Sequence, residues 1–161
     1  MSSFEIERNT IERNTDRTLA YFLLRIVLGV NIAVHGLSRL YSGAGAFAHE
    51  LVPLFSKTPL PATAVYTFGV SLPWLETFIG LLVLAGALTR YAYTLGMLLI
   101  AALTFGSTLR QDWGTAGLQL TYALVYAALL VARQYNSFSV DHWIAGRTER
   151  ARWTEKEGLA S

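Results

Sequence analysis

The chain has 161 residues, of which 53% are hydrophobic and 15% charged, with a formal net charge of +2. Soluble domains carry about 25% charged residues, so the composition argues against a soluble globular protein. The chain contains no cysteine, which excludes disulfides, thiolate metal sites and iron–sulfur ligation by thiolates.

Long uncharged windows define the fold class. Residues 58–75 give 18 positions without charge, and residues 91–109 and 114–132 give 19 each. A helix needs about 20 residues to cross the hydrocarbon core of a bilayer, so these windows have spanning length. The sequence predicts an all-α integral membrane protein, built as an antiparallel four-helix bundle.

The chain divides by composition into two tails and one transmembrane domain. Residues 1–17 form a polar N-terminal tail with two copies of the pentad Ile-Glu-Arg-Asn-Thr, and Thr15 or Asp16 is the expected cap of the next helix. Residues 136–161 form a polar, basic C-terminal tail. The connections at 89–90 and 110–117 are short, which makes neighbouring spans antiparallel. The transmembrane domain, residues 18–135, has expected spans at 19–40, 64–88, 91–109 and 118–133, with a candidate interfacial helix at 46–55.

Basic residues predict the orientation in the membrane. Four spans place both tails and the 89–90 link on one side, which carries nine basic residues, whereas the other side carries Arg39, Lys57 and Arg110. By the positive-inside rule both termini are expected in the cytoplasm, in a plasma or inner membrane. The expected partner is membrane lipid, and no nucleic acid, because no clustered basic groove is present. The nine basic residues on the side of the two tails are Arg8, Arg13, Arg17, Arg90, Arg133, Arg147, Arg150, Arg152 and Lys156.

Polar residues inside the spans indicate where function could lie. At about 100° per residue, four polar residues of the first span share a stripe roughly 120° wide: Arg25, Asn31, His35 and Arg39. Glu76 and Asn31 each lie roughly 18 Å from the inner ends of their spans, at about 1.5 Å of rise per residue. We predict that Glu76 bonds to Asn31 or His35 directly, or to Arg25 through its long side chain, because an unpaired carboxylate there costs several kcal/mol.

This cluster has two interpretations. It can be a structural pairing that locks two helices, or it can bind the polar end of a lipid-soluble molecule such as a quinone, or relay protons. His35 suits the second because histidine is the residue type that most readily exchanges a proton at neutral pH. No catalytic residue, metal or haem is predicted, since only one histidine lies securely within a span.

Small residues predict where the helices approach closely, since glycine lets two backbones come together. The expected packing positions are Gly29, Gly36, Gly69, Gly80 and Gly96. In the fourth span, Gln119, Tyr122 and Tyr126 are expected to serve core packing, with hydrogen bonding as the alternative.

Four motifs in order resemble the DoxX/DoxD family of small four-helix membrane proteins. They are Arg25-Ile-Val-Leu-Gly29, His35-Gly36-Leu-Ser-Arg39-Leu40, Glu76-x3-Gly80 and Gly86-Ala-Leu-Thr89-Arg90. The similarity covers about residues 20–135 and leaves out both tails. Arg39 stands where many relatives are expected to have lysine, a change that keeps the charge but alters its geometry.

The resemblance implies a membrane subunit of the thiosulfate:quinone oxidoreductase type, which passes electrons from a sulfur substrate to quinone. Carried over, it makes Arg25, Asn31, His35, Arg39 and Glu76 the candidates for a quinone or substrate pocket. Because the chain lacks cysteine, any oxidoreductase activity would need other subunits of a membrane complex. The alternative is a non-catalytic accessory subunit that docks onto a larger membrane complex, with the polar cluster serving only to lock helices.

Overall fold

The computed structural model describes residues 3–148, and within this range it contains helices and no strand. This confirms the all-α prediction. Residues 140–148 are also helical. The helices are α1 (Ser3–Ser42), α2 (Ala44–Leu54), α3 (Ala62–Ala85), α4 (Thr89–Leu109) and α5 (Trp113–Val131), followed by a short 3-10 turn, Arg133–Tyr135.

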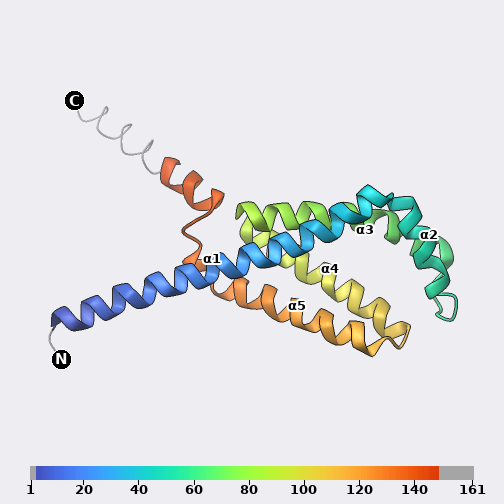
Figure 1. The fold of residues 1–161 in the computed structure, drawn as a ribbon, viewed down its shortest axis with the longest axis horizontal. Coiled ribbons are helices and arrows are strands. Elements are labelled where there is room, and N and C mark those ends of the chain that lie inside the picture. Colours follow the sequence, from blue (N-terminus) through green and yellow to red (C-terminus); the bar gives the residue numbers. More distant parts are fainter. Residues whose placement is uncertain (1–2, 149–161) are drawn as a thin grey trace.

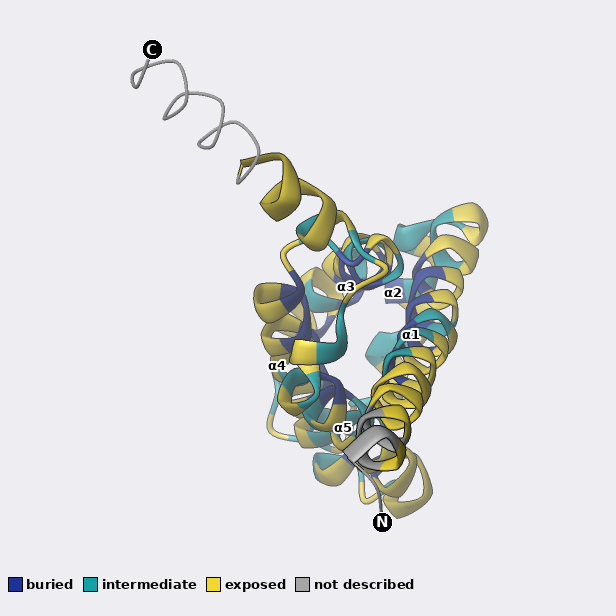
Figure 2. Ribbon diagram, turned by 90° about the vertical axis from the view of Figure 1, so that its left-hand side faces the viewer, coloured by how far each residue is buried: buried dark blue, intermediate teal, exposed yellow. Residues whose placement is uncertain are grey.

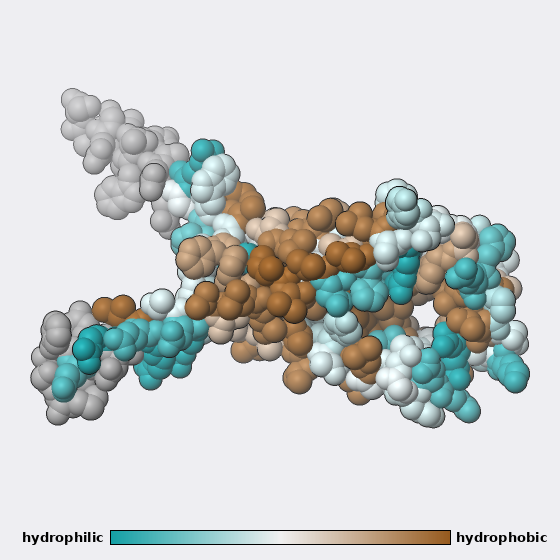
Figure 3. Space-filling model, viewed as in Figure 1, coloured by the Kyte–Doolittle hydropathy of each residue, from teal (hydrophilic) through white to brown (hydrophobic). Residues whose placement is uncertain are grey.

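Four of these helices are long and apolar enough to cross a membrane: residues 11–42, 62–85, 89–109 and 113–131. Their outward faces carry large apolar side chains, and hydrophobic surface covers the middle of the bundle on the face seen in Figure 3. Phe78, Leu98, Phe105 and Leu124 are each more than half exposed in the isolated chain. Soluble monomers rarely expose an apolar surface of this extent, so the protein is a multi-pass membrane protein.

The bundle consists of two helix pairs. α1 packs along α3, and α4 packs along α5, while α2 lies against α3 at one end of the bundle (Figure 1). Buried residues face the space between the helices, as the view along the bundle shows (Figure 2). We call the end that holds α2 and the α4–α5 link the α2 end, and the other the opposite end. The main core cluster contains Tyr21, Leu28, Ile32, Ile79, Val83, Ala92, Tyr93, Ile100, Tyr126 and Leu129.

The N-terminal boundary of the first helix differs from the prediction. α1 begins at Ser3, sixteen residues before the predicted start at 19, and extends beyond the other helices of the bundle (Figure 1). Thr15 does not cap a helix; its hydroxyl donates to the Ile11 carbonyl within α1 at 3.0 Å. The polar pentads contain neither glycine nor proline, and Arg8 and Glu12 form an i,i+4 pair at 3.9 Å. Such sequences favour helix although they lack an apolar stripe.

Small residues fix the register between α1 and α3. Gly29 contacts Leu84, and Gly36 contacts the backbone of Pro73 and Thr77. Gly80 lies against Ala33, so a side chain at Gly80 would collide with the α1 backbone. The other two predicted packing positions also lie at close contacts, Gly69 against Ala48 of α2 and Gly96 against the ring of Tyr126.

Candidate functional site

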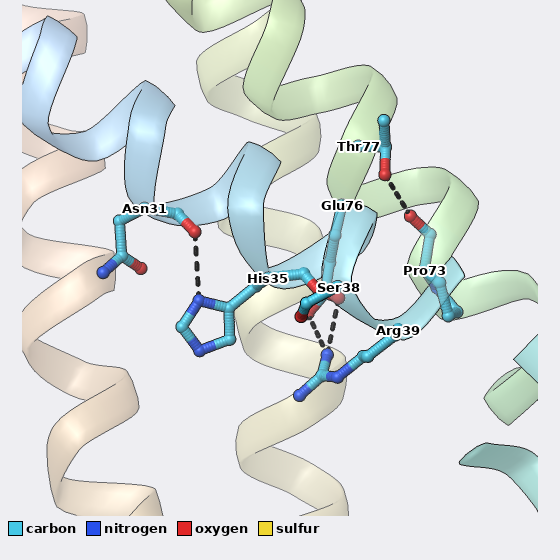
Figure 4. A network of polar contacts seen from close by, with 7 residues as sticks. All are labelled: Asn31, His35, Ser38, Arg39, Pro73, Glu76 and Thr77. Atoms are coloured by element: carbon cyan, nitrogen blue, oxygen red, sulfur yellow. Dashed lines mark hydrogen bonds and ion pairs between the residues drawn. The ribbon is translucent and has the colours of Figure 1, made fainter. Parts of the chain in front are cut away.

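A partly buried ion pair joins α1 to α3 within two of the membrane-spanning helices. Glu76 is 5% exposed, and Arg39 donates from Nη1 to both of its carboxylate oxygens, at 2.6 Å and 2.5 Å (Figure 4). The Arg39 guanidinium also lies over the ring of Phe47 in α2, 4.6 Å from the ring centre. A charged pair at this depth is costly to desolvate, so it persists only with close geometry.

The partner predicted for Glu76 is wrong, although the partner does come from the first span. The prediction measured depth from inner ends at residues 19 and 88. In the structure Gly36 lies beside Thr77, so Glu76 is level with Leu37, and Arg39 comes within reach. The prediction aligned α1 and α3 wrongly along their axes. The polar start of α1 does not indicate which of its residues lies beside the C-terminal end of α3.

Asn31 and His35 lie further along α1 and do not bond to Glu76. The Asn31 side-chain oxygen accepts a hydrogen bond from the Tyr122 hydroxyl of α5 at 3.0 Å. The His35 ring is exposed and lies between the side chains of Asn31 and Arg39, with Nδ1 3.0 Å from the Asn31 carbonyl oxygen (Figure 4). A carbonyl only accepts, so Nδ1 carries the proton, and in the neutral ring Nε2 keeps its lone pair.

A cavity of about 400 Å³ lies beside the ion pair, at the α2 end of the bundle. Its wall is mainly apolar and comes from α2, α3, α4 and α5, while Arg39 is the contribution of α1. The apolar lining includes Phe47, Leu51, Phe55, Phe68, Leu72 and Leu103, and the polar lining is Arg39, Ser107, Arg110, Thr115 and Gln119.

Some of the polar side chains that line this cavity have hydrogen-bond partners among the described residues, and one has a side-chain oxygen without any. Arg110 donates to Asp112 at 2.9 Å, and the Thr115 hydroxyl donates to the same carboxylate at 2.8 Å. By contrast, the side-chain oxygen Oε1 of Gln119 is buried and has no hydrogen-bond partner among residues 3–148. Gln119 therefore lines the cavity with an enclosed side-chain oxygen that is unpaired in this part of the chain, while the two charged groups of the lining, Arg39 and Arg110, supply only donors.

Arg25 lies at the opposite end of the bundle and is separate from the Glu76 pair. It is 2% exposed and donates to the Asn136 side-chain oxygen at 3.1 Å and to the Phe138 carbonyl at 2.6 Å. Its guanidinium fills the space beside Gly86, where a side chain would collide with it. From Gly86 to Glu76 is ten residues of chain, about 15 Å along α3.

Residues 136–141, which we call the C-terminal clasp, fold back onto the turn between α3 and α4. The Asp141 carboxylate accepts from the backbone N–H groups of Leu88 and Thr89, at 2.7 Å and 2.9 Å, and from the Thr89 hydroxyl at 2.9 Å. The Asp141 N–H in turn donates to the Gly86 carbonyl at 3.1 Å. Asp141 thus caps the N-terminus of α4, although it lies in the segment that was predicted to be a tail. The sequence near α4 offers one sign of this: no Ser, Thr, Asp or Asn directly precedes Thr89, so α4 has no local capping residue.

The fold and these contacts define a class: a multi-pass helical membrane protein with an intramembrane ion pair at the wall of an apolar cavity. In comparison with known proteins, the chain matches no family model, no curated protein and no solved structure. Function is therefore argued from the cavity and its polar groups.

Proposed function

We propose that the protein binds the ring of a lipid-soluble quinone in the cavity beside Arg39, as a membrane subunit of a quinone-linked redox complex. The observation that carries the proposal is the Arg39–Glu76 pair at the wall of an apolar cavity of about 400 Å³. Binding sites for small molecules are mostly apolar, of about 300–1,000 Å³, with a few placed polar groups.

The geometry of Arg39 suits a carbonyl ligand. Both contacts to Glu76 use Nη1, which leaves the hydrogens on Nη2 and Nε for a ligand oxygen. Glu76 holds the guanidinium in place, and the ring of Phe47 supports it from α2. A charge-assisted hydrogen bond to a quinone oxygen is about twice as strong as a neutral one. Arg39 therefore binds and orients the polar ring, while the apolar wall receives the rest of the molecule.

The resemblance to DoxX/DoxD proteins supports the same proposal, because Arg39 and Glu76 belong to two of its motifs. Reduction of a quinone to a quinol takes two electrons and two protons. The chain has no cysteine, so in this proposal a partner subunit supplies the electrons. With both termini in the cytoplasm, as the basic residues predict, the cavity lies in the outer half of the bilayer.

The test is binding of a decyl-substituted benzoquinone to the full chain in lipid nanodiscs. The key variant is the double substitution Arg39→Leu with Glu76→Leu, because replacing both partners of a buried ion pair by apolar residues is often neutral for stability. Arg90→Leu, at an exposed position of α4, is the matched control. We expect the double variant to fold and to lose at least tenfold in affinity, with the control unchanged.

The accessory-subunit alternative makes the opposite prediction. If the ion pair serves only to lock α1 to α3, the folded double variant binds the quinone as well as the wild type, or the wild type does not bind it. Either result refutes the quinone proposal. Co-purification of the double variant with other membrane subunits in unchanged amount would then favour the accessory role.

A further inference from the structure

Residues 140–148 form a helix that the rest of the described chain leaves almost uncovered. Asp141 is half-buried, and every other residue of this helix is exposed. Trp143 is 57% exposed and Ile144 is 52% exposed. The helix follows the C-terminal clasp and projects from the opposite end to one side of the bundle (Figure 1). Large apolar side chains gathered in this way indicate an interaction surface, because their contact with water is unfavourable.

The large side chains of this helix lie on one face. At about 100° per residue, four residues fall within an arc about 100° wide, and we call them the C-terminal face: Val140, Trp143, Ile144 and Arg147. The Arg147 guanidinium lies over the Trp143 ring, 3.8 Å from its centre. Asp141, which caps α4, lies about 110° from the middle of the arc, so the cap leaves the C-terminal face uncovered.

The clasp holds this helix at the level where the spans leave the hydrocarbon. Asp141 accepts from the backbone N–H groups of Leu88 and Thr89, and these lie between the end of one span at Ala85 and the start of the next at Thr89. The helix begins one residue before Asp141, so its first turn lies at the boundary between lipid and water. Tryptophan is enriched at this boundary, where its ring can lie among acyl chains while its N–H meets the headgroups.

The apolar surface of the spans continues to this helix. Phe138, two residues before the helix, is exposed, and its ring contacts the edge of Phe22 of α1 at 5.6 Å between ring centres. Leu19 and Leu23 of α1 are exposed as well. The C-terminal face is therefore an extension of the surface that the bundle presents to lipid.

The charges near this face favour an anionic surface. Within residues 140–148 the charged residues are Asp141 and Arg147, and Asp141 is already bound to the bundle. Arg90 and Arg133, next to the residues of the clasp contact, are exposed. Residues 149–161 carry three acids and three bases, so they add no net charge. The exposed charge that the helix can offer to a membrane surface is thus positive.

We propose that the C-terminal face lies in the headgroup layer of the same membrane and binds anionic phospholipid. Trp143 and Ile144 enter the upper part of the acyl chains, and Arg147 contacts a phosphate. Arginine can do this because its stem lies along apolar surface while the guanidinium stays in the polar layer. This surface lies at the other end of the bundle from the Arg39 cavity, so the proposal is independent of quinone binding.

The experiment measures the depth of single spin labels by power saturation. The full chain, which has no native cysteine, is placed in nanodiscs of phosphatidylcholine alone or mixed with phosphatidylglycerol. Three variants are labelled: Ile144→Cys on the C-terminal face, Ala145→Cys about 150° from its middle, and Leu124→Cys at an exposed position of α5. Oxygen dissolves in lipid, whereas a nickel chelate stays in water. We expect oxygen to relax the labels at 144 and 124 more than nickel does, and the reverse at 145.

Arg147→Gln tests the contribution of the anionic lipid. In nanodiscs with phosphatidylglycerol, it should lower the ratio of inserted to free label at position 144 by about fivefold, the factor that one basic residue contributes at an anionic membrane surface. In phosphatidylcholine alone it should change the ratio little. The control is Arg8→Gln, which removes an exposed arginine from the part of α1 that lies beyond the bundle, and it should keep the wild-type ratio.

The outcomes distinguish lipid from water and from protein. If nickel reaches the label at 144 as readily as the label at 145, the face lies in water and the proposal is wrong. If neither reagent reaches the label at 144, a second copy or another protein segment covers the face, and the proposal is equally wrong. An unchanged ratio for Arg147→Gln in the presence of phosphatidylglycerol overturns the role of anionic lipid. The substituted positions on this helix are exposed, so these variants should fold like the wild type.

Discussion

Removal of the Asp141 carboxylate should open the C-terminal clasp. Asp141→Ala deletes three accepted hydrogen bonds, two of them from the backbone N–H groups of Leu88 and Thr89. Loss of a helix cap costs about 0.5–2 kcal/mol, and hydrogen bonds to a charged group contribute about 1.5–3 kcal/mol. Asp141 is only half-buried and Leu88 is exposed, so water replaces part of the loss. We expect the variant to be less stable by about 2 kcal/mol.

Two measurements check this expectation. Unfolding of the purified protein by SDS titration in mixed micelles gives the free-energy difference. Trypsin cleavage after Arg133, an exposed residue next to the clasp, should become faster because the clasp no longer holds the following segment. Asp141→Asn keeps one acceptor oxygen and should fall between the variant and the wild type.

Asp16→Ala is the control, since it removes an exposed acid from α1 at the same end of the bundle. It should leave both the unfolding midpoint and the rate of cleavage unchanged. If Asp141→Ala behaves like this control in both assays, the clasp does not stabilise the bundle, and the reasoning from its hydrogen bonds is refuted.

Three further predictions concern packing, pH and orientation. Gly80→Ala should lower the free energy of unfolding by about 1–3 kcal/mol through overpacking against α1. Gly117→Ala, where the space is open, should leave it unchanged, and equal midpoints of SDS unfolding for the two variants would contradict this. The pKa of the Asp112 carboxyl lies below its usual value because the hydroxyl and the backbone N–H of Thr115 donate hydrogen bonds to it. The carboxylate therefore stabilises the fold above the ordinary aspartate pKa of about 3.9, and this stabilisation is lost as the pH falls through the lowered pKa. In SDS titrations at falling pH, Asp112→Asn should reduce that loss. In this cysteine-free chain, an impermeant maleimide should label Ser56→Cys in intact cells but Ser137→Cys only after permeabilisation; the reverse pattern would invert the proposed topology.

The sequence predicted three of the four spanning helices to within a few residues at most ends. α3 begins two residues before its predicted start and ends three before its predicted end, and α4 ends at the predicted Leu109. An uncharged window of spanning length is expected to be helical, because in lipid every backbone N–H and C=O group must form its hydrogen bond within the helix. The start of α5 at Trp113, five residues earlier than predicted, follows from the Asp112 cap, which accepts from Thr115 N–H.

The N-terminal part of the first helix and the clasp could not be predicted from uncharged windows of spanning length. Hydropathy detects apolar stretches, so it passes over a charged segment that is nevertheless helical, such as Ser3 to Arg17 of α1. The clasp depends on contacts between residues more than fifty positions apart, such as Asp141 with Leu88. No local pattern encodes such a pairing, although the separate residues are ordinary capping residues.

For Glu76, a partner on the first span was predicted, but the residue that pairs with it was not. The expectation that Glu76 needs a partner on the first span rests on the cost of an isolated charge in lipid, and that cost is independent of register. The identity of the partner depends on register alone: a shift of one or two helical turns between α1 and α3 exchanges Asn31 or His35 for Arg39. In a bundle whose neighbouring helices touch through glycines, register is fixed by contacts such as Gly80 with Ala33, which hydropathy does not reveal.

Two arginines of α1, Arg25 and Arg39, differ in their surroundings, and the difference helps to separate structure from function. Arg25 is 2% exposed, and the clasp accepts hydrogen bonds from both of its terminal nitrogens. The Arg39 side chain is 29% exposed and lines a cavity of about 400 Å³. A guanidinium enclosed by protein acceptors has no donors within reach of a ligand, whereas one at a cavity wall can offer its remaining N–H groups. That difference, rather than the number of charges, is why we propose the binding site at the Arg39 end of the contact between α1 and α3 and regard Arg25 as a structural anchor.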